Sequence, residues 1–371
     1  MKVLHTNFST PEGIREDFFT AAGAVKNTFR EEAAELFAAY DNMLAQCGCS
    51  QESEMLLRIH LSDVTNQYDI LQEIVKNRSS FISVVGQAPV DNRRIAIEAW
   101  HWHAPGKNGS ADKLEIALQN YPVCWFRLEP VKSSGSFDQT YEAFAALKDH
   151  LAAHNADVYN HTVRTWLYCR DVDNNYAGLV QARNKFFAEN GLTADTHFIA
   201  STGIEAQIAD VKQLVMMDSI NYPTLQTGQM QYLYALENLS PTAVYGVSFE
   251  RGTRVIFGDR SHYFISGTAS IDKAGNVLYN CDVASQTRRV MENISALLKE
   301  GDGSLDDIAI ATMYLRDTAD ADICRKIVYE TLQREIPLVT VKAPVCRPAW
   351  LVEIECIAVN NKGNKKYPVL A

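Results

Sequence analysis

The chain has 371 residues, of which 45 are acidic and 35 basic, and its formal net charge is -10 at pH 7. This acid excess leaves little basic surface for phosphate contacts, so we expect no nucleic-acid partner. No apolar run is long enough to cross a bilayer, and the first residues lack an apolar signal segment, so we expect no membrane partner either. Eight cysteines without metal-ligand spacing favour reduced thiols and a cytoplasmic location.

The first part of the chain alternates helix and strand signals. Apolar residues at helical spacing around Leu36 and Tyr40 predict a helix, and a second helix surrounds residues 70–75. The apolar runs 55–63 and 94–100 predict strands. The pattern leaves open whether a hairpin precedes the first helix.

The middle of the chain repeats this order. Residues 144–151 carry apolar side chains at helical spacing, and residues 163–171 form an apolar run typical of a strand. A second helix is predicted over residues 176–189. The apolar segment 198–217 then closes the unit.

The last part of the chain gives the clearest signals. A helix is predicted to begin near Asp282 and to end at Gly301. A strand over residues 310–317 and a helix over residues 322–334 follow. The apolar run 350–359 predicts the final strand.

Recurring positions support an internal repeat of this order. Asp63, Asp171 and Asp317 each end the strand that lies between the two helices of a unit. The segment 87–90 echoes the segment 342–345, since each contains Ala-Pro-Val. Repeated units of this kind bury a shared core when they pack together.

The repeat predicts three α+β units in one chain. Glu98 in the first unit then corresponds to Glu355 in the third, with one residue of slack. Loop-like segments at residues 105–110 and 221–241 would join the units, and the second is long enough to cover a cleft. The alternative is that unrelated α+β segments look alike at this level. The boundaries that we predict are 1–110, 111–240 and 241–371.

The final strand carries the most informative pair of residues. Glu353 and Glu355 lie two positions apart in an apolar strand, so they share a face. A carboxylate in such a strand is either paired or held with a raised pKa that suits acid–base chemistry. This Glu-Ile-Glu strand, the Ser-Gly hairpin at 264–272 and the segments 282–293 and 305–317 resemble, in order, the RidA/YjgF/UK114 superfamily.

The resemblance implies an α+β fold of the chorismate-mutase-like kind, with mixed sheets and helices packed on one face. Proteins of that superfamily form trimers with a site in each cleft between neighbouring subunits. Three tandem units could therefore close as a pseudo-trimer within one chain, either monomeric or assembled further as a homo-oligomer.

A second resemblance points to one branch of the superfamily. The segments 201–204, 245–252, 266–270 and 346–348 are similar to motifs of the chorismatases, which hydrolyse chorismate. Chorismate carries two carboxylates and an enolpyruvyl ether. Its hydrolysis begins with protonation of the vinyl methylene carbon and ends with release of pyruvate.

The resemblance implies that Glu355 is the catalytic acid and that Arg347 anchors a carboxylate. We predict that Glu355→Gln folds normally and loses turnover. The alternative for Glu355 is a structural carboxylate paired with an arginine. The other residues predicted to bind substrate are Arg183, Arg251, Tyr245, Ser266, Gly267, Cys346 and Glu353.

Two other functions remain open. One is an enamine or imine deaminase of the RidA type, although the substrate-binding arginine of those enzymes falls on Leu338. The other is non-catalytic binding of a small molecule. The sequence has no phosphate-binding loop or nucleophile elbow, and His101 and His103 lack a third ligand, so we predict a small carboxylate substrate with no cofactor and no metal. Whether Glu98 keeps a working site in the first unit is left open.

Overall fold

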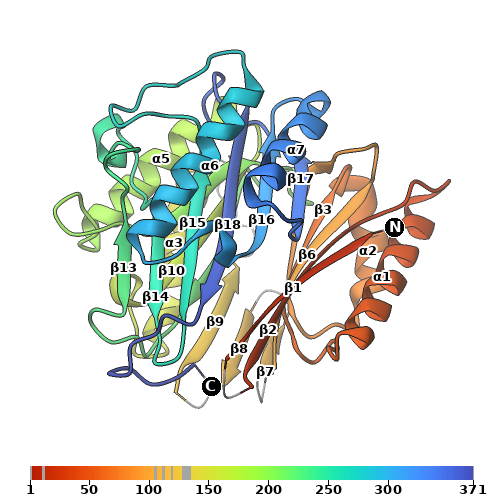
Figure 1. Cartoon of the computed structure of the whole chain (residues 1–371), viewed down its shortest axis with the longest axis horizontal. Helices are drawn as coiled ribbons and strands as arrows, with labels where there is room; N and C mark the ends of the chain where they lie inside the picture. The colour runs from red at the N-terminus through yellow and green to blue at the C-terminus, as the bar shows by residue number, and fades with distance from the viewer. Residues whose placement is uncertain are drawn as a thin grey trace.

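The protein is described by a computed structural model that covers residues 2–10, 13–103, 107–110, 113–117, 120–127 and 135–370. Its described strands form three sheets with helices packed on their outer faces (Figure 1). Within the described residues, no helix combines the length and apolar character that crossing a membrane requires. The α+β class predicted from the sequence is confirmed.

The first sheet has five strands in the order β1-β2-β6-β3-β4. The predicted helices and strands of this unit are all present, and the antiparallel pair β1–β2 is the hairpin that the sequence left open. The sequence did not predict β4, which pairs with β3 in parallel. The elements are β1 (Val3–Ser9), β2 (Arg15–Ala22), α1 (Phe29–Gln46), β3 (Glu54–Leu61), α2 (Val64–Val75), β4 (Phe81–Val85) and β6 (Ile95–Trp102).

The second sheet has six strands in the order β11-β10-β12-β9-β8-β7. Residues 107–110 were expected in a linker but form β7, while residues 105 and 106 lie outside the described part of the chain. We therefore propose that the second unit begins before residue 107 rather than at residue 111. The elements are β7 (Lys107–Ser110), β8 (Lys113–Ala117), β9 (Pro122–Arg127), α3 (Ser136–Ala152), α4 (Val158–His161), β10 (Thr162–Cys169), α5 (Val172–Glu189), β11 (Ala200–Glu205) and β12 (Val215–Asn221).

The third sheet has seven strands in the order β13-β14-β15-β18-β16-β17-β5, and its last strand comes from the first unit. The segment 221–241, expected to be a loop, contains the strand β13. Ile323 of α7 is 39% exposed, whereas Ile327 and Val328 of the same helix are buried. The elements are β5 (Ala88–Pro89), β13 (Met230–Leu233), β14 (Gly252–Ile256), β15 (Ser261–Thr268), α6 (Val283–Glu300), β16 (Ile308–Leu315), α7 (Ala321–Leu332), β17 (Leu338–Lys342) and β18 (Val352–Asn360), with 3-10 turns at Thr242–Tyr245, Leu305–Asp307 and Thr318–Asp320.

The three repeated aspartates mark the same structural position. Asp63 and Asp317 cap the helical segments that follow, and their carboxylates accept hydrogen bonds from the backbone N–H groups of Asn66 and Ala319. Asp171 occupies the corresponding place before α5, with a left-handed backbone (φ 49°) and no side-chain cap. Asp63 and Asp317 suit this place because a side-chain acceptor there satisfies the first free N–H groups of a helix. Before α5 the carboxylate of Glu205 accepts the N–H groups of Asp171 and Val172 instead.

Backbone pairing closes the three units into a ring. Gly86 of the first unit pairs with Gln207 of the second, and Ile204 of the second pairs with Val345 of the third. The strands β17 and β5 then join the third unit to the first. Each unit therefore contacts both others, as the predicted pseudo-trimer requires.

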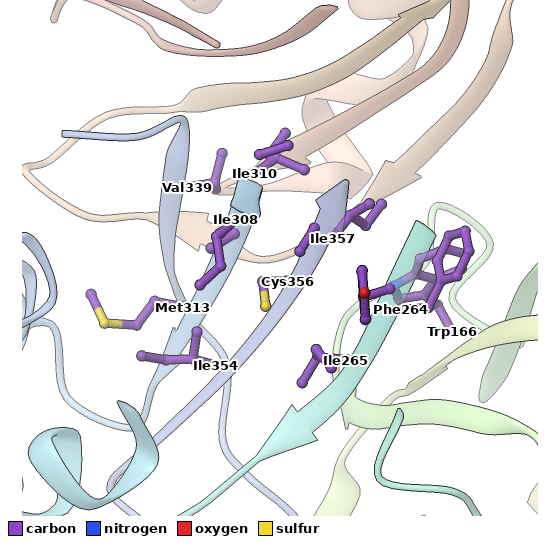
Figure 2. Packing of buried hydrophobic residues seen from close by; sticks show 14 of the residues in the cluster. Trp166, Phe264, Ile265, Ile308, Ile310, Met313, Val339, Ile354, Cys356 and Ile357 are labelled. Carbon is purple, nitrogen blue, oxygen red and sulfur yellow. The ribbon is translucent and has the colours of Figure 1, made fainter. Parts of the chain in front are cut away.

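All three sheets contribute to the largest apolar core. The ring of Trp125 on β9 lies 6.0 Å from that of Trp100 on β6 and 6.1 Å from that of Trp166 on β10. Figure 2 shows Trp166 beside Phe264 of β15, near the aliphatic side chains of β16 and β18. Two smaller cores lie beneath the helices of the first and second units. Each unit therefore packs one sheet face against its helices and the other against its neighbours, which explains the nearly continuous apolar strands.

Candidate functional site

A cavity of ≈ 420 Å³ lies between the second and third units. The second unit supplies one face of α5 and the strand β11, and the third unit supplies β15, β18 and three loop segments. Most of the predicted site residues meet here, although they are far apart in the sequence. The lining residues that come from the prediction are Arg183, Arg251, Gly267, Cys346, Arg347 and Glu353.

Glu353 is the carboxylic acid of this cavity. It lies on β18, and its side chain is almost completely buried. Burial is the main cause that raises its pKa to about 8, and the nearby charge of Glu355 adds to this effect. Glu353 therefore holds its proton at neutral pH, and a protonated carboxyl beside a cavity is able to act as a general acid.

Gly267 makes room for this carboxyl. A Cβ atom at position 267 would lie 2.1 Å from Oε1 of Glu353. The pairing of β15 with β18 shifts register between Ile265 and Thr268, so Ser266 and Gly267 form a bulge at this point. Bulges often lie beside functional sites because they redirect side chains. Here the bulge separates a structural serine from the cavity wall at Gly267.

Three arginines line the same cavity. Arg183 is 1% exposed, and its Nε and Nη2 atoms have no hydrogen-bond partner among the described residues. The guanidinium carbons of Arg183 and Arg251 lie 5.9 and 5.2 Å from the ring of Phe249. Arg347 lies over the ring of Trp350, at 5.0 Å. Together these cations make the cavity suited to an anion.

Two further side chains complete the wall. Burial raises the pKa of the Cys346 thiol to about 12, so this group is neutral. Tyr176 of α5 forms a hydrogen bond with Cys346 and packs against Gly203. Sequence reasoning missed Tyr176, although it lies on the same helix as Arg183 and that helix was predicted.

Glu355 lies outside the lining of this cavity. Its carboxylate accepts hydrogen bonds from Arg164 Nη2 (2.8 Å), Trp166 Nε1 (2.8 Å) and the hydroxyl of Thr202. Arg58 Nη1 lies 3.7 Å away. Beside Glu355 is a space of only ≈ 20 Å³. This arrangement matches the structural alternative, in which arginines satisfy the carboxylate.

Two other predicted residues have different positions. Ser266 is buried, and its hydroxyl donates to the backbone oxygen of Glu250 (2.6 Å) and accepts from Arg164 Nη1 (3.0 Å). It therefore braces the strands rather than lining the cavity. The side chain of Tyr245 lies outside the described part of the structure, while its neighbour Gly246 does line the cavity.

Comparison of equivalent positions in the three units shows which side chains recur and which occur once. Arg58, Trp166 and Thr312 stand five residues before the three aspartates, and they pair across the sheets with Glu98, Asp218 and Glu355. An acidic side chain thus occurs at this position in every unit, as the predicted match of Glu98 with Glu355 requires.

The three equivalent acids are all buried and paired. Glu98 accepts hydrogen bonds from Arg58 (2.8 Å) and Thr312 (2.9 Å), and Asp218 accepts from Arg127 (2.9 Å). Burial by itself raises the pKa of Glu98, but Arg58 and His60 outweigh it and lower this pKa to about 2. Acids that recur three times in the interior fit a role in holding the units together.

Glu353, by contrast, occurs in one unit. The residues that correspond to it across the middle strands are Ala96 in the first unit and Met216 in the second. The cleft between the third and first units contains a space of ≈ 260 Å³ and is lined by Ala96. In that cleft Arg325 is paired with Asp91 at 2.7 Å. The cleft between the second and third units is therefore distinguished by its carboxyl.

Comparisons with known proteins agree with this architecture. Residues 255–360 match the family described as Endoribonuclease L-PSP. A 3-aminoacrylate deaminase RutC of Acinetobacter baylyi is 32% identical over 96 residues, which span 26% of this chain and 76% of the relative. A RutC family protein of Pyrococcus abyssi is 33% identical over 96 residues, with the same shares of each chain.

The similarity to a solved structure extends beyond the third unit. A crystal structure of a chorismatase matches with a TM-score of 0.65 and 16% sequence identity, and the match covers 96% of this chain and 99% of that chain. At this identity the likeness shows a shared fold. Together with the family match over residues 255–360 and the RutC relatives, it shows that the chain belongs to the RidA/YjgF/UK114 superfamily and has a chorismatase-like layout.

Proposed function

We propose that the cavity between the second and third units hydrolyses the enol ether of a small cyclic dicarboxylate, chorismate or a close analogue, and releases pyruvate. Glu353, rather than Glu355, would be the acid. The observation that carries the proposal is a carboxyl with a pKa of about 8 enclosed with three arginines in a cavity of ≈ 420 Å³. Cavities of roughly 300–1,000 Å³ hold small ligands.

The reaction begins with the transfer of one proton to one carbon atom of the substrate. Glu353 donates its proton to the vinyl methylene carbon, which becomes a methyl group, and the ether carbon becomes an oxocarbenium ion. Water adds to that carbon and returns a proton to the Glu353 carboxylate. The resulting hemiketal breaks its bond to the ring oxygen, which gains a proton, and pyruvate and a ring alcohol leave.

The arginines account for the two carboxylates of the substrate. Arg183 has free donors, and binding a carboxylate would satisfy the buried guanidinium atoms that have no partner among the described residues. Arg251 and Arg347 line the same cavity and provide further positive charge. The expected order is therefore binding by arginine and protonation by Glu353.

The test is incubation of the purified chain with chorismate, with substrate loss and pyruvate release followed together. Glu353→Gln should reduce turnover by a factor of about 10²–10⁴, the usual contribution of a general acid, with a small change in KM. The product identifies whether the ring remains a dihydroxy diene or is aromatised. No pyruvate release by the wild type would exclude chorismate, and full activity in Glu353→Gln would exclude Glu353 as the acid.

One observation favours a second candidate. A stretch of 96 residues of this chain is 32% identical to a 3-aminoacrylate deaminase, and the same arginines could hold the single carboxylate of an enamine or imine acid. Ammonia release from 3-aminoacrylate that exceeds pyruvate release from chorismate would reverse the order of the two proposals. Binding of either acid without turnover would select the third possibility, a non-catalytic binding protein.

A further inference from the structure

Four side chains of metal-ligand type meet in the second unit, outside the cavity described above. They are Glu115 on β8, Cys124 on β9, His150 on α3 and His154 in the turn that follows α3. One ligand atom from each residue lies within 4.8 Å of those of all the others. The cluster joins a β-hairpin to the helix that packs on the same sheet.

The secondary structure explains why these residues meet. Glu115 and Cys124 are directly opposite in the antiparallel pair β8–β9, so their side chains are neighbours. His150 lies in the last turn of α3 and His154 in the turn just after the helix ends at Ala152, where their rings are 5.0 Å apart. The ring of His150 stacks on Phe126 of β9 at 4.6 Å, which fixes the helix beside the hairpin.

The polar atoms of the cluster are incompletely satisfied. Nε2 of His150 is buried and has no hydrogen-bond partner among the described residues. Cys124 is 1% exposed, so its sulfur forms the floor of the cluster. Nε2 of His154 lies 3.0 Å from Oε1 of Glu115, and these two side chains are partly exposed, which provides a route for an ion.

We propose that Glu115, Cys124, His150 and His154 bind a divalent zinc-class cation. A thiolate, two imidazoles and a carboxylate are typical zinc ligands, and a neutral imidazole pair with two anions balances the charge of the ion. Zinc bonds of about 2.0–2.3 Å would draw the ligand atoms to about 3.5 Å apart, a small movement for the partly exposed Glu115 and His154. The thiol of Cys124 loses its proton when the metal binds.

The site is structural rather than catalytic. Four protein ligands fill a tetrahedral zinc ion and leave no position for substrate or water. The ion would fasten the β8–β9 hairpin to α3. No spacing pattern in the sequence marks this site, because its ligands come from an antiparallel strand pair, from α3 and from the turn after α3.

A second cluster is a useful contrast. Asp17, Cys49 and His103 also lie within 4.8 Å of one another. Asp17, however, accepts hydrogen bonds from Arg15 Nε (3.0 Å) and is paired with His5 (2.7 Å). A guanidinium at this distance repels a cation, so we assign no metal there. Cys49→Ser is therefore a matched control.

The test uses the full chain after treatment with a chelator. Titration with Zn²⁺ against a chromophoric competitor should show one ion per chain, and Co²⁺ should give the charge-transfer band of a cobalt thiolate with tetrahedral d–d bands. Cys124→Ser should lose the charge-transfer band, whereas Cys49→Ser and the exposed-site variant Cys281→Ser should keep it. Zinc should also raise the Tm of the wild type.

The test remains decisive because a second variant changes a partly exposed residue and should fold. His154→Gln changes a partly exposed position in the turn after α3 and should fold, as circular dichroism would check. It should lower the zinc affinity by more than about 100-fold, since even changes to residues behind the ligands cost up to that factor. Absence of stoichiometric zinc binding by the wild type would overturn the proposal. So would a cobalt band that survives Cys124→Ser or disappears in Cys49→Ser.

Discussion

Two glutamates on one strand have opposite environments. Glu353 and Glu355 share a face of β18, yet Glu355 accepts hydrogen bonds from Arg164, Trp166 and Thr202, while Glu353 lines a cavity. The burial of Glu353 raises its pKa to about 8. A carboxyl that is neutral at pH 7 is able to donate a proton, whereas a carboxylate paired with an arginine is suited to stabilising the fold.

The raised pKa predicts how activity depends on pH. We expect kcat/KM of the wild type to fall as the pH rises through about 8, because Glu353 then loses the proton that it must donate. A pH–rate profile measured with saturating and with limiting substrate would check this. A profile that stays flat from neutral pH to well above 8 would contradict the assignment.

The same proton also links stability to pH. Between the ordinary carboxyl pKa of 4.5 and about 8, the folded chain holds a proton that the unfolded chain has released. The free energy of unfolding of the wild type should therefore fall as pH rises through this window, by up to about 1.4 kcal/mol per pH unit. Urea unfolding of Glu353→Gln should lack this part of the slope. Parallel curves for the two proteins would show that the pKa is not raised.

Substitution of Arg183 should affect stability and substrate binding in opposite directions. Replacing it with methionine removes a buried guanidinium that has two atoms without partners among the described residues, so we expect unchanged or increased stability. Loss of charged hydrogen bonds worth about 1.5–3 kcal/mol should weaken substrate binding by roughly 10- to 150-fold. Thermal unfolding and KM would be measured together.

The control for Arg183→Met is Arg164→Met. Arg164 is also buried, but it donates to Glu355, so its loss should destabilise the fold. Equal loss of stability in both variants would place Arg183 among the structural residues.

Among the secondary-structure elements, the bulge in β15 and one face of α5 form much of the cavity wall. Ser266 turns inward to Arg164 and to the backbone of Ser201, while Gly267 donates its N–H to Thr202 (2.8 Å) and leaves space for Glu353. A regular strand would not give adjacent residues these roles. The local irregularity therefore fixes where the acid lies.

Gly267→Ala tests this arrangement. The added Cβ would lie 2.1 Å from Oε1 of Glu353, so the carboxyl or the bulge must move, at a cost of about 1–3 kcal/mol. We expect turnover to fall more than stability. Gly135→Ala is the control, because its Cβ would meet only Asp138 Oδ2 at 3.7 Å. Normal turnover in Gly267→Ala would show that the bulge does not position the acid.

Across the whole molecule, three buried acidic side chains connect neighbouring units through hydrogen bonds. Glu355 of the third unit accepts hydrogen bonds from three residues of the second, and Glu98 of the first accepts one from Thr312 of the third. Asp218 of the second unit accepts one from Ser83 of the first. Each interface of the ring thus contains one acid that bridges two units.

Glu355→Gln should therefore act on stability. It leaves Arg164 buried without its full counter-charge, and breaking a buried pair costs about 3–5 kcal/mol. Urea unfolding should show this loss, with Glu353→Gln as the matched control on the same strand. A Glu355→Gln variant of normal stability and no turnover would instead restore Glu355 as the catalytic residue.

Local signals in the sequence were enough to predict the order of most helices and strands along the chain. Helical spacing, capping aspartates and apolar strand runs are local signals, so α6, β16 and β18 could be predicted close to their observed bounds. The strands β4, β13 and β17 were missed because their runs are short and their pairing partners are distant. The set of cavity residues was largely recoverable from motifs, but Tyr176 carried no signal of its own.

The different environments of the two glutamates arise only when the chain folds. They stand on the same face of one strand, so no pattern within β18 separates them. The difference arises because the second unit places Arg164, Trp166 and Thr202 against Glu355 and leaves Glu353 at the cavity wall. A side chain's pKa and partners depend on residues brought near by folding, and those neighbours are set by the ring of three units rather than by the strand itself.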